Sequence, residues 1–175
     1  MLLFGIAGKA RSGKDTVAKY LEDSYRFHRM SFAGPLKLAT HCMFDIEHVP
    51  DSEKEAEARF WGVSPRQMYQ GVGDAMKDKF GRDFWVKRWQ KEYSELAHIV
   101  DIVVSDVRFE EEAQAIRACG GHIIHLVRPG AGLAGAEGLH NSEAGVEYDE
   151  SDYVIHNEGS KDDLYEKLDK IMENL

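Results

Sequence analysis

Short apolar runs alternate with amphipathic stretches along the whole chain. Unbroken runs of apolar and β-branched residues predict buried strands of a parallel sheet, whereas apolar positions three or four residues apart predict helices. The predicted strands span 2–7, 27–32, 99–105, 122–127 and 153–156, and the predicted helices span 16–23, 35–42, 84–96, 110–118 and 161–175. This alternation predicts an α/β three-layer fold, with helices flanking a parallel sheet of about five strands.

Turn and cap residues define the region between the second and third predicted strands. Pro35 suits the first turn of a helix, and Ser64-Pro65 supplies both an N-cap and a first-turn proline for another. Gly71, Gly73 and Gly81 interrupt that region, so it predicts either one helix or two. The polar and acidic segment 45–60 is expected to be a mobile loop or an exposed helix, and no function is matched to it.

Composition narrows the class of protein. The chain has 175 residues, of which 43% are hydrophobic and 30% charged, as expected for a single soluble domain with a sizeable core. Its net charge of −9 argues against binding to a nucleic-acid polymer. No apolar run approaches the ~20 residues of a membrane helix, and the first residues already belong to a strand. Cys42 and Cys119 are expected to be free thiols, so we expect a cytoplasmic protein.

A phosphate-binding loop follows the first predicted strand. It reads Gly8-Lys9-Ala10-Arg11-Ser12-Gly13-Lys14-Asp15-Thr16 and leads into a helix. In such a P-loop the backbone N–H groups cradle a triphosphate, the glycines allow a tight turn, and the lysine reaches the β- and γ-phosphates. The alternative interpretation is a strand-to-helix turn that binds no ligand.

The P-loop departs from the general motif at one position. Asp15 stands where Ser or Thr normally contacts Mg²⁺, and Thr16 follows it. A carboxylate is a hard oxygen ligand, so Asp15 could hold Mg²⁺ directly or through water. Asp15 and Thr16 are therefore the candidate metal ligands.

Further candidate residues follow the third predicted strand. Ligands of parallel α/β sheets bind beyond the carboxyl ends of the strands, and Asp106 and Arg108 lie at such an end, with Glu112 one helical turn later. Asp106 could orient magnesium-bound water opposite the P-loop. The alternative is that Asp106 is the N-cap of the next helix and Arg108 its solvated neighbour.

The fourth predicted strand leads into a flap. Arg128 precedes a Gly- and Ala-rich stretch, 129–138, which ends near His140-Asn141-Ser142-Glu143. An arginine at the base of a closing flap can stabilise charge on a transferring phosphoryl group. The alternative is an ordinary exposed loop, and for His140 this is as good an interpretation as function.

Cations and aromatic residues are mixed over 64–89. Such a mixture can bind a phosphate and stack a base, but it is also typical of an amphipathic surface helix. Trp85 and Trp89 share one helical face, which favours a core position for both. The guanine-reading Asn-Lys-x-Asp and the Asp-x-x-Gly loop of GTPases do not appear where the fold would require them, so ATP is the expected nucleotide.

Taken together, these motifs resemble those of phage-type deoxynucleoside monophosphate kinases, in family order along nearly the whole chain. The matching blocks are the P-loop in its Gly-Lys-Asp-Thr form, Phe32-Ala33-Gly34-Pro35-Leu36-Lys37, Ser64-Pro65-Arg66-Gln67-Met68-Tyr69-Gln70 with Gly73-Asp74, Phe84-Trp85-Val86-Lys87, Ser105-Asp106-Val107-Arg108 with Glu112, Val127-Arg128-Pro129-Gly130, His140-Asn141-Ser142-Glu143 and Asn157-Glu158-Gly159-Ser160.

The resemblance implies a P-loop nucleoside monophosphate kinase fold and Mg²⁺-dependent transfer of the γ-phosphoryl group of ATP to a deoxynucleoside monophosphate. By that analogy the ATP site comprises Gly8, Arg11, Ser12, Gly13, Lys14, Asp15, Thr16, Asn157 and Gly159, with the last two bordering the adenine. The monophosphate side comprises Lys9, Leu36, Lys37, Arg66, Gln70, Gly73, Trp85, Asp106, Arg108 and Glu112. The catalytic residues are Lys14, Asp106, Arg108 and Arg128.

The same analogy implies one kinase domain over 1–175, with an acceptor-binding helical region near 34–96, a lid near 128–145 and a homodimeric assembly. Two alternatives to this function stay open. One is another small-molecule P-loop kinase, for example one acting on phosphomevalonate, and the other is an ATP-binding switch without catalysis. The preferred base is not predicted, because base recognition depends on a few hydrogen bonds whose geometry the sequence does not fix.

Overall fold

The computed structural model describes residues 1–46, 60–132 and 145–175. These residues form two compact units. The first combines Met1–Ser31 with Trp89–Leu175, and the second is Phe32–Arg88. The P-loop lies in the first unit, and most residues expected to bind the acceptor lie in the second.

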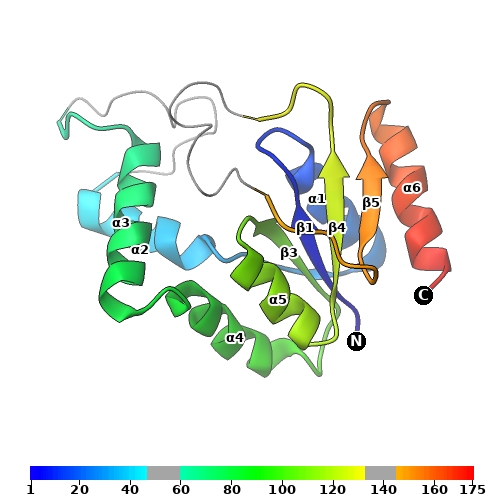
Figure 1. Ribbon diagram of the computed structural model, residues 1–175, viewed down its shortest axis with the longest axis horizontal. Helices are drawn as coiled ribbons and strands as arrows, with labels where there is room; N and C mark the ends of the chain where they lie inside the picture. The colour runs from blue at the N-terminus through cyan, green and yellow to red at the C-terminus, as the bar shows by residue number, and fades with distance from the viewer. Residues whose placement is uncertain (47–59, 133–144) are drawn as a thin grey trace. The chain divides into compact units, whose positions relative to one another are not determined.

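The first unit is built on a parallel sheet of five strands, as the sequence predicts (Figure 1). The strands are β1 (Leu3–Ala7), β2 (His28–Met30), β3 (Ile102–Val107), β4 (His122–Val127) and β5 (Tyr153–His156). Their order across the sheet is β2-β3-β1-β4-β5. Since β1 is central and all strands run the same way, the loops after β1, β3, β4 and β5 leave the sheet at one edge.

Helices cover both faces of this sheet and complete the predicted three layers (Figure 1). On one face lie α1 (Lys14–Tyr25) and α6 (Lys161–Glu173), and on the other lies α5 (Glu110–Ala118). Within the described residues, no helix has the length and apolar character needed to span a membrane.

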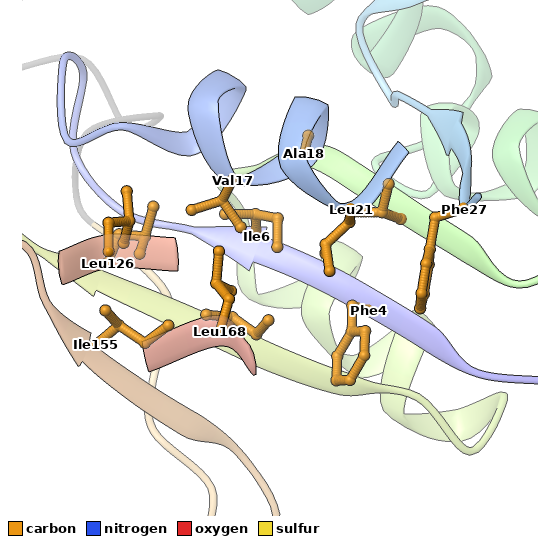
Figure 2. Packing of buried hydrophobic residues seen from close by; sticks show 12 residues of the cluster. Phe4, Ile6, Val17, Ala18, Leu21, Phe27, Leu126, Ile155 and Leu168 are labelled. Carbon is orange, nitrogen blue, oxygen red and sulfur yellow. The ribbon is translucent and has the colours of Figure 1, made fainter. Parts of the chain in front are cut away.

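Alternate residues of β1 explain how the layers pack. Phe4 and Ile6 are fully buried on the α1 and α6 side, in a cluster that includes Val17 (Figure 2). Gly5 faces α5 on the other side, where a Cβ would lie 2.7 Å from methyl groups of Ile116 and Ile123. A larger residue at Gly5 would therefore push α5 away from the strand that precedes the P-loop.

The second unit contains α2 (Gly34–Phe44) and α3 (Pro65–Phe80), and α4 (Phe84–Leu96) begins in it. The expected first-turn prolines of α2 and α3 are present, and Ser64 caps α3 by accepting a hydrogen bond from the backbone N–H of Gln67. Helix α3 continues through Gly71 and Gly73 without a break and ends at its C-cap, Gly81, before α4 begins. Gln67 returns a bond to the Ser64 N–H, so this cap is a complete capping box.

Candidate active site

The P-loop joins β1 to α1 through a strongly turned backbone. Gly8 has a φ of 146°, Arg11 of 64° and Gly13 of 108°, all in the region that L-residues rarely adopt. Arg11 holds this conformation without the freedom of glycine, which is the kind of local strain found at ligand sites. Gly13 directly precedes the first residue of α1, so the positive end of the helix dipole lies at the loop.

Close contacts require glycine at two of these positions. A Cβ at Gly8 would lie 2.7 Å from the backbone oxygen of Leu126 and 2.8 Å from Ser12 Oγ. A Cβ at Gly13 would lie 2.7 Å from Asn157 Nδ2. The ends of β4 and β5 therefore pack directly against the loop.

Lys14 folds its ammonium group over the loop. The residue is 8% exposed, and its Nζ donates to the backbone oxygens of Gly8 at 2.7 Å and Lys9 at 2.8 Å. Ser12 Oγ, in the same loop, is also buried, and no described residue pairs with that oxygen. A lysine ammonium and a hydroxyl on a tightly turned loop suit the oxygens of a polyphosphate.

The candidate metal ligands Asp15 and Thr16 lie in the first turn of α1. Asp15 is exposed and forms an ion pair with Arg29 of β2, a partner that sequence reasoning missed. The described residues contain no cluster of three or more His, Cys, Asp and Glu side chains that could enclose a metal ion. Mg²⁺ usually needs only one or two protein oxygens when it is bound with phosphates, so the carboxylate of Asp15 and the hydroxyl of Thr16 fit it chemically.

The end of β3 presents the next group of residues. Asp106 is the penultimate residue of the strand, and the N-cap of α5 is Phe109, so the alternative interpretation of Asp106 as an N-cap is wrong. Glu112 closes the turn instead, because its Oε2 accepts from the backbone N–H of Arg108 at 2.8 Å and of Phe109 at 3.1 Å. Buried Glu112 thus fixes the backbone of Arg108, while a contact of its own with substrate stays a prediction.

Arg128 follows β4 and begins a turn that touches the P-loop. The N–H of Ala131 donates to the oxygen of Arg128 at 3.2 Å, and the N–H of Gly132 donates to the oxygen of Ala10 at 2.9 Å. The base of the predicted lid is therefore attached to the phosphate loop. The rest of that lid, with His140-Asn141-Ser142-Glu143, lies outside the described residues, as does most of segment 45–60.

The residues expected to border adenine follow β5. Asn157 is buried and reaches the P-loop, whereas Gly159 is exposed. A Cβ at Gly159 would collide with the carboxylate of Asp163, which caps α6 together with Ser160. A side chain at 159 would therefore move the Asp163 carboxylate away from the position in which it caps α6.

In the second unit, three of the predicted acceptor residues meet. A Cβ at Gly73 would lie 3.3 Å from Leu36 Cδ2, and Trp85 Nε1 donates to the backbone oxygen of Gly73 at 3.2 Å. Trp85 and Trp89 are both buried, as their shared helical face predicts. The other predicted residues lie on the same helices, with Lys37 on α2 and Arg66 and Gln70 on α3.

Sequence reasoning also missed a contact between those two helices. His41 Nε2 lies 2.6 Å from Tyr69 Oη, within hydrogen-bonding distance. The spacing places His41 on the face of α2 that carries Lys37, and Tyr69 on the face of α3 that carries Arg66, but it gives no signal that the two side chains meet.

A second buried polar cluster of the first unit centres on Asp152, which comes just before β5. Its side chain has no exposed surface and accepts from Arg117 Nη2 at 2.6 Å and His125 Nε2 at 3.0 Å. The N–H groups of Ile123 and Asp149 donate to it at 3.0 and 3.1 Å. Burial raises the pKa of Asp152, but the bonds from Arg117, His125 and the two amides outweigh it and lower the pKa to about 2.

The fold is that of P-loop kinases. A crystal structure of TT1252 from Thermus thermophilus matches 99% of this chain and 97% of its own with a TM-score of 0.56 and 18% identity. A dephospho-CoA kinase from Campylobacter jejuni matches 98% of this chain and 95% of its own with a TM-score of 0.51 and 13% identity. At these identities the likeness shows the fold alone, and it confirms the predicted fold class.

Sequence comparison identifies the family. The model of the family described as deoxynucleotide monophosphate kinase matches residues 44–168. A putative deoxynucleotide monophosphate kinase of Acanthamoeba polyphaga mimivirus is 31% identical over 99% of this chain and 97% of its own. The deoxynucleotide monophosphate kinase of Escherichia phage RB69 is 35% identical over 64% of this chain, but that match spans only 45% of the phage protein. The chain belongs to the deoxynucleotide monophosphate kinase family, as its motifs predict.

Proposed function

We propose that this chain transfers the γ-phosphoryl group of ATP to the phosphate of a deoxynucleoside 5′-monophosphate, giving ADP and the diphosphate. The observation that carries the proposal is the P-loop of a chain in this family, in which Lys14 Nζ donates to the backbone oxygens of Gly8 and Lys9. The reaction serves the synthesis of DNA precursors, as the resemblance to phage kinases implies.

On the donor side, the loop N–H groups and Lys14 bind and orient the β- and γ-phosphates. Asp15 and Thr16 are the residues that would hold Mg²⁺, directly or through water. When bound, Mg²⁺ neutralises charge on the phosphate oxygens. The protein contributes position and positive charge and forms no covalent bond to the transferring group.

On the acceptor side, an oxygen of the monophosphate attacks the γ-phosphorus in line, and the bond from that phosphorus to the β,γ-bridging oxygen breaks. No general base is needed, because the acceptor phosphate is already anionic at neutral pH. We propose that Arg108, whose backbone N–H is bonded to Glu112, pairs with the acceptor phosphate through its planar guanidinium. Asp106 is the residue that would help to hold Mg²⁺ through water, and Arg128 stabilises charge on the transferring group.

The remaining monophosphate contacts are proposed for Lys9 of the P-loop and for the helical region near 34–96. The predicted residues in that region are Leu36, Lys37, Arg66, Gln70, Gly73 and Trp85. Mixed cations and aromatic rings can hold a phosphate and stack a base. A lid near 128–145, a homodimer and action in the cytoplasm are further parts of the proposal; light scattering checks the dimer.

The deciding experiment is an ADP-release assay with ATP and Mg²⁺. Each of the four deoxynucleoside monophosphates, and phosphomevalonate, is tested as the acceptor in a separate reaction. We expect turnover with at least one of the four and none with phosphomevalonate. The Lys14→Ala variant at the same concentration controls for contaminating kinases. Turnover on phosphomevalonate alone, or ATP binding without turnover on any acceptor, contradicts the proposal; the second outcome identifies a nucleotide-binding switch.

A further inference from the structure

We infer that Asn157 is a positioning residue that holds the P-loop in its phosphate-binding conformation, in addition to any contact it makes with the base. This inference deepens the proposed function and rests on it only in assuming that the loop binds a polyphosphate. Asn157 follows β5, 144 residues after Gly13, the last glycine of the P-loop.

The contact itself is buried and direct. Asn157 Nδ2 donates to the backbone oxygen of Ser12 at 2.9 Å, and the residue is 8% exposed. Its own backbone N–H donates to the oxygen of Val127 at 2.8 Å. The asparagine is thus fixed to the end of β4 by its main chain and to the P-loop by its side chain.

The Ser12 carbonyl needs such a donor because of the geometry of the loop. A loop can turn its N–H groups toward an anion only if the carbonyls point elsewhere, and a buried carbonyl without a partner costs about 1–3 kcal/mol. The next carbonyl, that of Gly13, already accepts from the N–H of Val17 in the first turn of α1. Among the described residues, Asn157 Nδ2 is the donor that the structure provides for Ser12.

The fit around the side chain is close. A Cβ at Gly13 would lie 2.7 Å from Asn157 Nδ2, so the amide occupies the space beside the turn. The loop that carries Asn157 is itself held, because Lys167 Nζ donates to the oxygen of His156 at 2.6 Å and Ser160 caps α6. These contacts give Asn157 a fixed position from which to orient the P-loop.

Tripolyphosphate, which carries no base, distinguishes a role of Asn157 in positioning the loop from a contact between Asn157 and adenine. If Asn157 only borders the adenine, its loss weakens ATP binding and leaves tripolyphosphate binding unchanged. If it positions the loop, both ligands lose affinity alike, because both depend on the same N–H groups. The Michaelis constant for the monophosphate should move less in either case, since all but one of the residues proposed to bind that substrate, Lys9 being the exception, lie outside the P-loop.

The test uses Asn157→Leu, a neutral change of similar size that removes the donor, with Asn157→Ala as a second variant should the first fail to fold. The matched control is Asn174→Leu, because Asn174 Nδ2 donates to the oxygen of Lys170 at 2.5 Å beyond the last turn of α6. Calorimetry gives the dissociation constants of ATP and of tripolyphosphate as its competitor. Circular dichroism and thermal melting check the fold.

We expect both constants to rise about tenfold in the Asn157 variants, as for the loss of one buried hydrogen bond, and to stay unchanged in the control. Unchanged tripolyphosphate binding, with or without weaker ATP binding, overturns the inference. Binding is measured without an acceptor, so the result stands even if no monophosphate is turned over. Failure of the proposed function and failure of this inference are therefore distinguishable.

Discussion

Lys14 and Asp152 are both buried in the first unit, but their charges are paired with different kinds of partner. The ammonium group of Lys14 donates to main-chain oxygens of its own loop. A bound anion pairs more strongly with an ammonium group than these neutral oxygens do, so it can replace them. Asp152 is surrounded by fixed donors, two of them on the side chains of Arg117 and His125. A buried charge held by replaceable partners is a candidate for ligand binding, whereas one enclosed by charged and backbone donors stabilises the fold.

The sharpest test of this contrast is Lys14→Ala. We expect turnover to fall by about 100-fold or more, the usual cost of one electrostatic catalytic donor, while the melting temperature changes little. Steady-state ADP release and thermal melting measure the two effects. Lys19→Ala is the control, since Lys19 is an exposed lysine later on α1. Near-normal turnover in a folded Lys14 variant would remove the P-loop from the mechanism.

Asp152→Asn should show the opposite pattern. The fall in the pKa of Asp152 from 3.8 to about 2 corresponds to roughly 2.5 kcal/mol of favourable interaction with the ionised form, so we expect the free energy of unfolding to fall by about that amount. Turnover per folded molecule should be retained. Urea denaturation measures the stability, with exposed Asp162→Asn as the control. A stable variant with impaired turnover would place Asp152 in the functional site and reverse the comparison.

The same carboxylate gives the stability a defined pH dependence. The pKa of Asp152 is lowered in the folded state from 3.8 to about 2. Its contribution is therefore fully present above the unfolded value, near pH 4, and is lost as pH falls toward 2. Urea denaturation between pH 5 and 2 should show a steeper loss of stability for the wild-type protein than for Asp152→Asn; parallel curves would contradict this assignment.

Arg108→Lys tests the acceptor side with a smaller expected effect. Lysine keeps the charge but loses the planar fork that can engage two phosphate oxygens, so we expect kcat/KM for the monophosphate to fall about tenfold. ATP affinity, titrated without acceptor, should stay the same. Arg26→Lys, an exposed change at the end of α1, is the control. An equal loss of ATP affinity would move Arg108 to the donor side.

Asp15→Asn should have the smallest effect of the four substitutions tested, at Lys14, Asp152, Arg108 and Asp15. We expect a severalfold rise in the Mg²⁺ concentration needed for half-maximal rate, with little change in KM for the monophosphate, because the charge of one hard oxygen ligand is lost. Asp15→Ser, which restores the hydroxyl of the general motif, should recover much of the loss. If both variants respond to Mg²⁺ as the wild type does, then Asp15 serves only its ion pair with Arg29.

The sheet and the P-loop could be predicted because their signals are local. A buried strand followed by glycines and a helix start lies within 16 residues, and each later strand is a compact apolar run. Boundaries were less accurate: β3 was predicted at 99–105 but spans Ile102–Val107. The Ile99 N–H instead donates to the oxygen of Leu96 in the turn that ends α4, so a β-branched residue was used outside the sheet.

The polar partnerships could not be predicted, since each joins residues far apart in the chain. Asp152 meets Arg117 from 35 positions away, and Asn157 meets Ser12 from 145. Neither pairing leaves a period or spacing in the sequence. The motif blocks predict Asn157 as a site residue, but its contact with the P-loop follows only from the fold.

The central place of β1 has a consequence for how the protein is made. Its hydrogen-bonded neighbours are β3 and β4, and Leu3 pairs with Ile102. During synthesis from the N-terminus, β1 and the P-loop must therefore wait for about a hundred further residues before the first partner strand emerges from the ribosome. Pairing over that separation is slow in folding. The nascent chain must keep an apolar strand from aggregating throughout this delay.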